Sequence, residues 1–343
     1  MIRSHNPVRR HRFAALTTAF AVILVLAACA PIDEGDGNGD ASAAASDSGG
    51  GADGGQLSIA TGGTGGVYYP LGEGVASVIR DNVSGYDATV QETNASVDNL
   101  QLIGNGGADI AFSLGDTAAD AVEGRGDFEG APIAACALGK IYNNFTQLVT
   151  SADSGIASIA DLEGKRVSLG SPGSGTEVIA LRILEAAGID PDAGIERQQL
   201  GVDETAAALR DGTIDAGFWS GGLPTGALVD YATTGEMVLV PTAEVASAMA
   251  DQYGPFYVEA EIPADTYEGQ TEAIPSVVVP NVLVVSTEMD EGLQEQLTAA
   301  IFGNQEALAA VHPAANEIDI ATAGEVEFMD VCPGAQTWFD EQG

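Results

Sequence analysis

Hydrophobic residues recur along the chain in two patterns: short continuous apolar runs, and apolar residues at helical spacing. Residues 57–61 form a run of strand length, and the glycine-rich segment 62–70 follows at once. A helical pattern then begins, because Pro70 suits a first helical turn and one apolar face is formed by Leu71, Val75, Val78 and Ile79. This stretch therefore predicts a strand, a glycine-rich turn and a helix.

The same arrangement returns in the second half of the chain. An apolar run at 166–170 leads into the Gly/Ser-rich segment 171–177, after which Val178, Leu181, Ile183, Leu184 and Ala187 recur at helical spacing. Ser174 and Glu177 also fit a capping box, so local helix capping is an alternative to ligand contact for this turn. Two α/β units, each with a Gly/Ser/Thr-rich helix start, predict a cleft in which a small solute is held between domains.

The amino terminus is typical of an export signal. Four arginines precede an uncharged apolar stretch at 13–26, which is short for a membrane span. Residues 26–29, Leu-Ala-Ala-Cys, resemble the lipobox of bacterial lipoproteins, and this predicts a signal peptide at 1–28 and lipidation of Cys29. A secretory signal with an accidental Cys and a short membrane anchor are the alternatives. Residues 29–55 are rich in Gly, Ala, Ser and Asp, so we expect a flexible linker between the lipidated Cys and the folded part.

The net charge of the chain limits the classes of partner that it can bind. The chain carries 12 Lys+Arg against 50 Asp+Glu, a net charge of −38. Loss of residues 1–28 would remove four arginines and no acid, leaving −42. Nucleic acid is excluded as a partner, because binding phosphates takes clustered Lys and Arg. An anionic ligand would have to be held by backbone N–H groups, helix ends and hydroxyls, which the two glycine-rich turns can supply.

Residues of common catalysis are scarce. The His residues are His5, His11 and His312, and the sequence contains no G-x-S-x-G, C-x-x-C or H-E-x-x-H motif. We therefore expect no enzyme, no metal and no cofactor. Because carboxylates are abundant, an acid/base pair stays open, and an exported enzyme and a structural surface lipoprotein are kept as alternatives.

Several motifs in order resemble the TAXI-type solute-binding proteins of TRAP transporters. The resemblance spans about residues 57–340. It rests on segments 62–70, 96–100, 153–156, 161–167, 173–176, 209–216 and 333–335. One departure is Cys332, since the family usually has His before Pro-Gly-Ala.

The resemblance implies an α/β fold like that of periplasmic binding proteins, with two lobes joined by hinge strands and the ligand cleft between them. Lobe 1 is expected at 56–146 plus 283–343, lobe 2 at 147–282, and the hinges at 146–150 and 282–286. It implies a monomeric extracytoplasmic receptor on the outer face of the cell membrane. This receptor would deliver a small carboxylate, such as a glutamate- or glutamine-like amino acid or a 2-oxo or dicarboxylic acid, to membrane permease subunits. A sugar, a cation or a compatible solute is the alternative ligand.

Carried onto this chain, the resemblance and the turn chemistry predict a set of ligand-binding residues. They are Thr64, Gly65, Gly66, Tyr68, Tyr69, Ser96, Asn99, Ser113, Asp116, Ser174, Gly175, Thr176, Ser220, Gly221 and Gly222. Tyr68 and Tyr69 have helix-start packing as an alternative, and Ser96 is a good N-cap. Trp219 is expected in the core rather than in the ligand wall.

Two cysteines remain once Cys29 carries lipid. In an exported protein, Cys136 and Cys332 would lie in an oxidising compartment. Cys332 precedes a last helix, 335–341, that we expect to pack near Cys136. We predict a disulfide between them. Two buried free thiols are the alternative.

Overall fold

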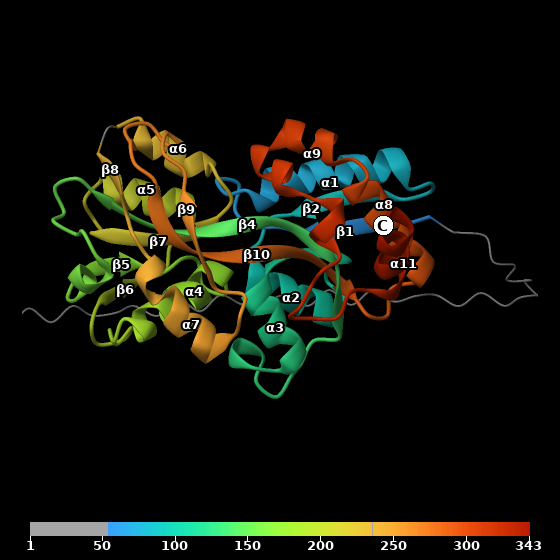
Figure 1. Ribbon diagram of the computed structural model, residues 1–343, viewed down its shortest axis with the longest axis horizontal. Helices are drawn as coiled ribbons and strands as arrows, with labels where there is room; N and C mark the ends of the chain where they lie inside the picture. The colour runs from blue at the N-terminus through green and yellow to red at the C-terminus, as the bar shows by residue number, and fades with distance from the viewer. Residues whose placement is uncertain (1–53, 235) are drawn as a thin grey trace, which may run out of the picture. The chain divides into compact units, whose positions relative to one another are not determined.

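The structure is a computed structural model that describes residues 54–234 and 236–343. The predicted signal peptide 1–28, Cys29 and most of the linker 29–55 lie outside the described residues. Within residues 54–343 the chain forms one compact unit (Figure 1). Among the described helices, none has the length and apolar character needed to cross a membrane.

A single ten-stranded sheet runs through this unit. Its strands are β1 (Gln56–Ala60), β2 (Asp87–Gln91), β3 (Ile110–Leu114), β4 (Ala135–Ser151), β5 (Arg166–Ser168), β6 (Glu196–Gln198), β7 (Ala216–Gly221), β8 (Met237–Val240), β9 (Val258–Ile262) and β10 (Ile274–Ser286). The order is β2-β1-β3-β10-β4-β7-β5-β6, with β8 paired to β4 and β9 paired to β10.

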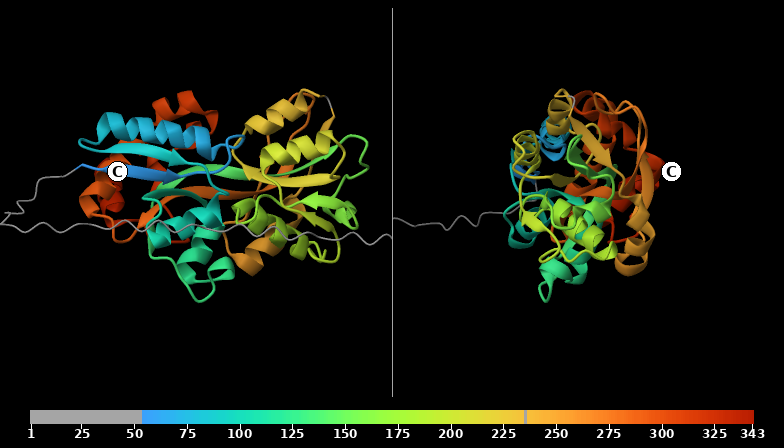
Figure 2. Two further views of the ribbon diagram at one scale, coloured as in Figure 1. Left: turned by 180° about the vertical axis from the view of Figure 1, so that it is seen from behind. Right: turned by 90° about the vertical axis from the view of Figure 1, so that its left-hand side faces the viewer.

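Helices cover both faces of the sheet. They are α1 (Tyr68–Asn82), α2 (Ser96–Asn105), α3 (Gly115–Glu123), α4 (Gly175–Ala186), α5 (Val202–Arg210), α6 (Gly226–Ala232), α7 (Ala246–Tyr253), α8 (Glu291–Phe302), α9 (Gln305–Val311), α10 (Ile320–Ala323) and α11 (Pro333–Gln342). In one half, α1 and α9 lie on the face opposite α2 and α3; in the other half, α5 and α6 lie opposite α4 and α7 (Figures 1 and 2).

Strands β4 and β10 divide the sheet into two lobes. In lobe 1, β1, β2 and β3 are parallel and β10 adds to β3 through residues 281–285. In lobe 2, β5, β6 and β7 are parallel and β4 adds to β7 through residues 145–150. Both long strands pass from one lobe to the other, so the sheet is continuous across the junction. The fold is therefore the expected one, two α/β lobes joined by paired hinge strands.

The pairings of β4 and β10 bear on the expected hinges at 146–150 and 282–286, which stay a prediction. The β4–β10 ladder has a register shift between Pro280 and Val282, where proline has no N–H to donate. Residues 146–150 already pair with lobe 2, and residues 282–285 pair with lobe 1. On these pairings we propose a lobe boundary near residues 141–145 and 279–282.

Local elements follow the apolar pattern. The run at 57–61 gives β1, and the helix predicted from Leu71 begins three residues earlier, at Tyr68, because Pro70 sits inside the first turn. The second unit gives β5 and α4, as predicted. Each lobe buries its own apolar clusters, with Ile59, Phe112 and Leu283 in lobe 1 and Val167, Ile183 and Phe218 in lobe 2.

The carboxyl-terminal helix is bonded to lobe 1. Cys136 of β4 and Cys332 at the start of α11 form a disulfide with a Cα–Cα distance of 5.0 Å. The Cys332 N–H also donates to the Ala137 carbonyl at 2.9 Å. The segment before α11 is thereby held against β4.

Candidate functional site

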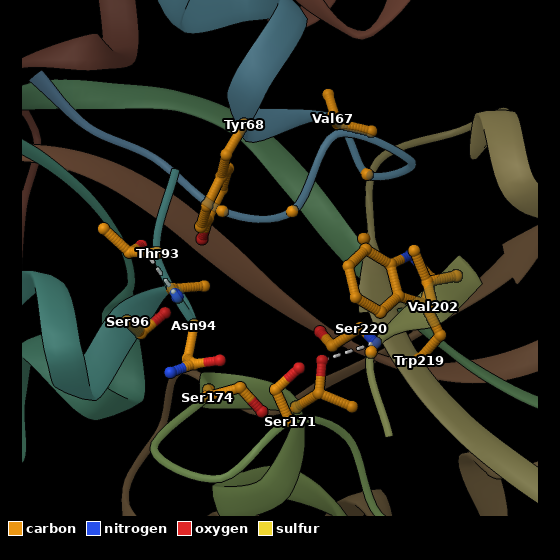
Figure 3. Close-up of a pocket in the computed structure, with 18 of the residues that line it drawn as sticks. Val67, Tyr68, Thr93, Asn94, Ser96, Ser171, Ser174, Val202, Trp219 and Ser220 are labelled. Carbon is orange, nitrogen blue, oxygen red and sulfur yellow. Dashed lines mark hydrogen bonds between the residues drawn. The ribbon is translucent and has the colours of Figure 1, made fainter. Parts of the chain in front are cut away.

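A cavity of about 290 Å³ lies between the two lobes. Figure 3 shows residues from four turns converging on it: the loop after β1, the start of α2, the turn before α4 and the end of β7. Each turn follows or precedes a strand end at the junction of the lobes. The cavity is therefore at the place where the sequence predicted a cleft, and its size suits a small solute.

Lobe 1 contributes the start of α1. The Tyr68 hydroxyl donates to Asn281 Oδ1 of β10 at 2.5 Å, and burial raises the pKa of Tyr68, so the phenol stays neutral. Within the described residues, the N–H groups of Val67, Tyr68 and Tyr69 donate to no acceptor in the chain. The positive end of this helix is thus left with free donors beside the cavity.

Lobe 2 contributes the start of α4. Ser174 is the N-cap, and its Oγ accepts from the Glu177 N–H at 3.1 Å. The Glu177 carboxylate does not complete a capping box, because it accepts from the Gly173 N–H at 3.0 Å and pairs with Arg197. Throughout the described part of the chain, no acceptor is found for the N–H groups of Gly175 and Thr176. Capping and free donors therefore coexist in this turn.

Direct contacts close the cleft around the cavity. The Gly65 N–H of lobe 1 donates to Asp203 Oδ2 of lobe 2 at 3.1 Å, and the Ala227 N–H donates to the Gly65 carbonyl at 3.2 Å. Across the cavity, the Gly173 carbonyl accepts from the N–H groups of Val97 and Asp98, both at 3.2 Å. The lobes are in a closed arrangement.

Charge in the cavity comes from its rim. Glu92, Asp203 and Glu204 line it and are solvent-exposed, and no Lys, Arg or His is among its lining residues. The inner wall is built of hydroxyls, an amide and aromatic rings. Any anionic group would meet helix ends and hydroxyls, whereas a positive group would find the rim carboxylates.

Eight of the predicted residues line this cavity, namely Gly66, Tyr68, Ser96, Ser174, Gly175, Thr176, Ser220 and Gly221. Thr64 and Gly65 line a neighbouring hollow at the mouth of the cleft, with Pro224 and His312. Tyr69 is half-buried and lies one helical step from Tyr68, and Gly222 is buried against the Tyr142 ring. These two residues do not line the cavity.

The side chains of Asn99 and Ser113 hydrogen-bond backbone groups of the sheet and do not line the cavity. The Asn99 amide donates to the carbonyls of Ala60, Thr61 and Phe112, and the Ser113 hydroxyl donates to its neighbour's carbonyl. Both side chains are fully buried and their donors are used. Neither residue lines the cavity, because strand ends had to be hydrogen-bonded first, and their contact with ligand stays a prediction.

Ser96 has a different role from the N-cap that its sequence position suggested. Ala95 is the N-cap of α2, with φ of 78°, and Ser96 is the first helical residue. The Ser96 Oγ accepts from the Leu114 N–H of β3 at 3.1 Å while the side chain lines the cavity. Tertiary pairing with β3 has therefore replaced local capping.

Asp116 lies outside the cavity, in an ion pair between the lobes. Its Oδ2 is 3.5 Å from Arg182 Nη1 of α4 and accepts from the Tyr257 hydroxyl at 2.6 Å. Arg182 also pairs with Asp120 of α3. Burial raises the pKa of the Asp116 carboxyl, and the Arg182 guanidinium opposes that rise. Asp116 thus joins α3 to α4 and does not line the cavity.

Many lining residues were missed or misjudged by the sequence prediction, and Tyr142, Asn144 and Trp219 are three of them. Tyr142 and Asn144 lie in the middle of long β4, where nearly every residue is buried and no local pattern indicates a cavity. Trp219, expected in the core, lines the cavity and donates from Nε1 to Thr225 Oγ1 at 3.0 Å. Trp219 had a signal in its position next to Ser220, and Gly62, Gly63 and Val67 had one in the glycine-rich segment to which they belong.

Fold and site together define a class, the two-lobed α/β binding protein with a closed interlobe cavity. The chain belongs to the NMT1-like family, whose model matches residues 59–343.

Several solved structures are similar to this chain at low sequence identity. A structure from work on glutathione import in Gram-positive bacteria through GshT and the cystine ABC importer TcyBC of Streptococcus mutans is 12% identical with a TM-score of 0.50. The match covers 77% of this chain and 95% of that chain. The periplasmic aliphatic sulphonate binding protein SsuA from Escherichia coli is 16% identical with a TM-score of 0.47, covering 83% and 82%. The alkanesulfonate-binding protein SsuA from Xanthomonas axonopodis is 16% identical with a TM-score of 0.48, covering 83% of each chain.

Proposed function

We propose that this protein is an extracytoplasmic receptor that binds a small solute between its lobes and delivers it to membrane subunits of a transporter. The observation that carries the proposal is the closed cavity at the lobe junction, flanked by the free N–H groups of α1 and α4. Lobe closure around a solute would proceed through the paired strands β4 and β10. Family membership and fold are consistent with this role.

The ligand class that we propose is a small carboxylate. Two helix amino termini and the Ser174 and Thr176 turn offer donors to an anion without a Lys or Arg. A helix end contributes up to about 2 kcal/mol in partly buried geometry, so two ends and several hydroxyls together can hold one carboxylate. The residues that we propose as contacts are the eight predicted ones that line the cavity.

The transporter that we propose is of the TRAP type, on the motifs that resemble TAXI proteins. The structural neighbours named above include ABC-associated proteins, and the two transporter types differ in their energy source. Uptake of the bound solute in reconstituted vesicles would decide between them. A TRAP system should lose uptake when ion gradients are dissipated, whereas an ABC system should depend on ATP. Anchoring through lipidated Cys29 would keep the receptor on the outer face of the cell membrane.

A thermal-shift screen tests the receptor proposal. The panel is L-glutamate, L-glutamine, 2-oxoglutarate, C4 dicarboxylates, sugars, glycine betaine and simple cations. A ligand at 100 times its Kd stabilises the folded state by roughly 2.7 kcal/mol, which gives a measurable rise in Tm. A shift with one small carboxylate, confirmed by calorimetry without product formation, is the expected result. A shift only with a sugar, betaine or cation would overturn the carboxylate and keep the receptor.

The turn before α4 has its own test. Thr176→Pro removes one free N–H and the hydroxyl that accepts from the Ser220 N–H at 3.1 Å, while proline is tolerated in a first helical turn. We expect calorimetry to show loss of ligand binding and circular dichroism to show that lobe 1 is still folded. Unchanged affinity would remove this turn from the site.

A further inference from the structure

Four buried hydroxyls in the described part of the chain have no hydrogen-bond partner. They belong to Tyr142, Thr146, Ser220 and Tyr231. An unpaired buried hydroxyl is costly, so each one needs an explanation. Tyr142 and Ser220 line the interlobe cavity, whereas Thr146 and Tyr231 do not. Two of the unpaired buried hydroxyls therefore lie at the cavity and two lie elsewhere. The two outside the cavity supply matched controls for the two that line it.

Ser220 ends strand β7 with its backbone already bonded. Its N–H donates to Thr176 Oγ1 at 3.1 Å, and its carbonyl accepts from Asn144 Nδ2 at 3.3 Å. The side chain is only 5% exposed, and its hydroxyl faces the cavity (Figure 3). The residue is held rigidly while its hydroxyl stays free, which suits a contact supplied by a ligand.

Tyr142 lies in β4 at the point where that strand passes between the lobes. The residue is 3% exposed, its ring lies against Gly222, and its carbonyl accepts from Asn281 Nδ2 at 3.1 Å. Burial raises the pKa of Tyr142 well above its ordinary value, so the phenol is neutral and can donate and accept. A ligand bound here would touch the hinge strand itself.

Most other hydroxyls of the wall have at least one partner, and within the described residues the partly buried Ser171 hydroxyl has none. Tyr68 donates to Asn281, and the oxygens of Ser96, Ser174 and Thr176 accept backbone N–H groups. The cavity thus has helix ends that suit a carboxylate and, among the buried hydroxyls of its described wall, two that have no partner at all, those of Tyr142 and Ser220. A ligand with only one polar group would leave those hydroxyls unpaired.

We propose that Tyr142 and Ser220 form a second polar subsite, which binds a hydrogen-bonding group on the ligand distant from its first carboxylate. The inference rests on the proposed receptor function and assigns residues of this chain to the second polar group of the ligand. The ligand would be a bifunctional small acid, carrying an amide, hydroxyl, carbonyl or second carboxyl group, and not an acid with an apolar tail.

Paired probes test the subsite in the unmodified protein. Each pair has an acid with a distal polar group and an analogue without it: L-glutamine and L-norvaline, 2-oxoglutarate and 2-oxovalerate, succinate and butyrate. We expect the bifunctional member of the binding pair to bind at least about tenfold more tightly by calorimetry, since a site built to hydrogen-bond a group rejects analogues that lack it.

Conservative variants then show which residues cause the difference in affinity between the two members of a probe pair. Tyr142→Phe and Ser220→Ala should each weaken the bifunctional probe roughly tenfold and leave the apolar analogue unchanged, so the ratio within the pair falls. Tyr231→Phe, which removes an equally buried unpartnered hydroxyl outside the cavity, should leave that ratio as it is. Without ligand, the three variants should unfold at the same denaturant concentration as the parent or above it, because an unpaired hydroxyl has been removed.

The outcomes separate the two proposals. An acid that binds with the same pair ratio in the parent, Tyr142→Phe and Ser220→Ala would overturn the subsite and leave the carboxylate receptor standing. Equal affinity for both members of every pair in the parent would overturn it as well. If no acid in the panel raises Tm, the proposed carboxylate receptor fails, and the subsite inference fails with it.

Discussion

Asn99 joins the ends of two strands to the loop that follows β2. Its amide donates to carbonyls at the end of β1 and within β3, the shortest distance being 2.6 Å to the Thr61 oxygen, and its Oδ1 accepts from the Thr93 hydroxyl at 2.6 Å. No water can replace these bonds, because the side chain is fully buried. The glycine-rich turn that borders the cavity therefore begins from a strand end held by one amide.

Replacing Asn99 should cost stability. Asn99→Ala leaves buried carbonyls unpaired, and we expect the free energy of unfolding to fall by about 2–3 kcal/mol in urea titration. Asn82→Ala is the matched control, because the Asn82 amide is exposed and bonds only to Val78 within its helix. That change should cost less than about 0.5 kcal/mol. Equal losses in the two variants would contradict the role of Asn99.

Between elements, the most deeply buried charges link α3 to α4. The Asp116 side chain is fully buried and that of Arg182 is 13% exposed, and the Tyr257 hydroxyl bridges them, with Arg182 Nη1 to Tyr257 Oη at 2.7 Å. Arg182 also lies over the Tyr253 ring, 4.6 Å from its centroid. Because α3 belongs to lobe 1 and α4 to lobe 2, this cluster ties the lobes together outside the cavity.

Arg182→Met should be strongly destabilising at neutral pH. Removing one partner leaves Asp116 buried and unpaired, at a cost of about 3–5 kcal/mol. The pKa of Asp116, already raised by burial, rises further without Arg182. An acid whose pKa is higher in the folded state favours folding when protonated, so the cost should shrink as pH falls through that raised pKa toward the ordinary value of about 3.9.

The measurement is urea unfolding of both proteins between pH 7 and pH 5. Arg80→Met is the control, because Arg80 and Asp87 are a largely exposed pair 3.8 Å apart and should contribute less than about 1 kcal/mol. A cost for Arg182→Met that is no larger than for Arg80→Met, or that does not change with pH, would argue against the buried ion pair.

At the scale of the whole molecule, closure depends on glycines at the lobe contacts. A Cβ on Gly175 of lobe 2 would lie 2.4 Å from Leu114 Cδ1 and 2.7 Å from Ser96 Oγ of lobe 1. A Cβ on Gly66 would lie 3.0 Å from the Trp219 ring. The missing side chains thus let two helix starts approach the opposite lobe closely, which is a second use of glycines beside exposing N–H groups.

Gly175→Ala should keep the lobes folded but hinder their closure. The alanine suits a helix as well as glycine or better, so unfolding without ligand should change little. Small-angle scattering with saturating ligand should give a larger radius of gyration than the parent, and affinity should fall at least about tenfold from steric overlap. Gly226→Ala should behave as the parent, because its Cβ would meet only the Gly65 oxygen at an ordinary 3.6 Å. If the Gly175→Ala protein, saturated with ligand, has the same radius of gyration as the parent, the proposed role of Gly175 in lobe closure is refuted.

The disulfide acts on the same scale, since it closes a loop with a sequence separation of 196. In the chain-entropy model such a loop corresponds to about 5 kcal/mol. The Cys136→Ala/Cys332→Ala variant should lose stability of that order in urea unfolding, and reductant should shift the parent but not the variant. Alkylation of the unfolded, unreduced protein followed by peptide mapping should leave both cysteines unmodified. Alkylated Cys136 and Cys332 would restore the alternative of two free thiols.

The sequence by itself determined the local units of this protein. The strand before Gly62, the helix after it, and the second unit around Ser174 follow from apolar spacing and turn residues, which act over a few positions. Eight of the predicted binding residues reach the cavity, because a turn after a parallel strand necessarily lies at the sheet edge where the lobes meet.

Only the tertiary structure decided which polar side chains the sheet itself would use. Asn99 and Asp116 follow strand ends just as Ser96 and Ser174 do, yet strand pairing and the ion pair with Arg182 occupy them. Tyr142 carries no local signal, and it reaches the cavity because β4 pairs with β10 more than a hundred residues away. A side chain's burial and partners are set by segments distant along the chain, and no periodicity within a few residues encodes them.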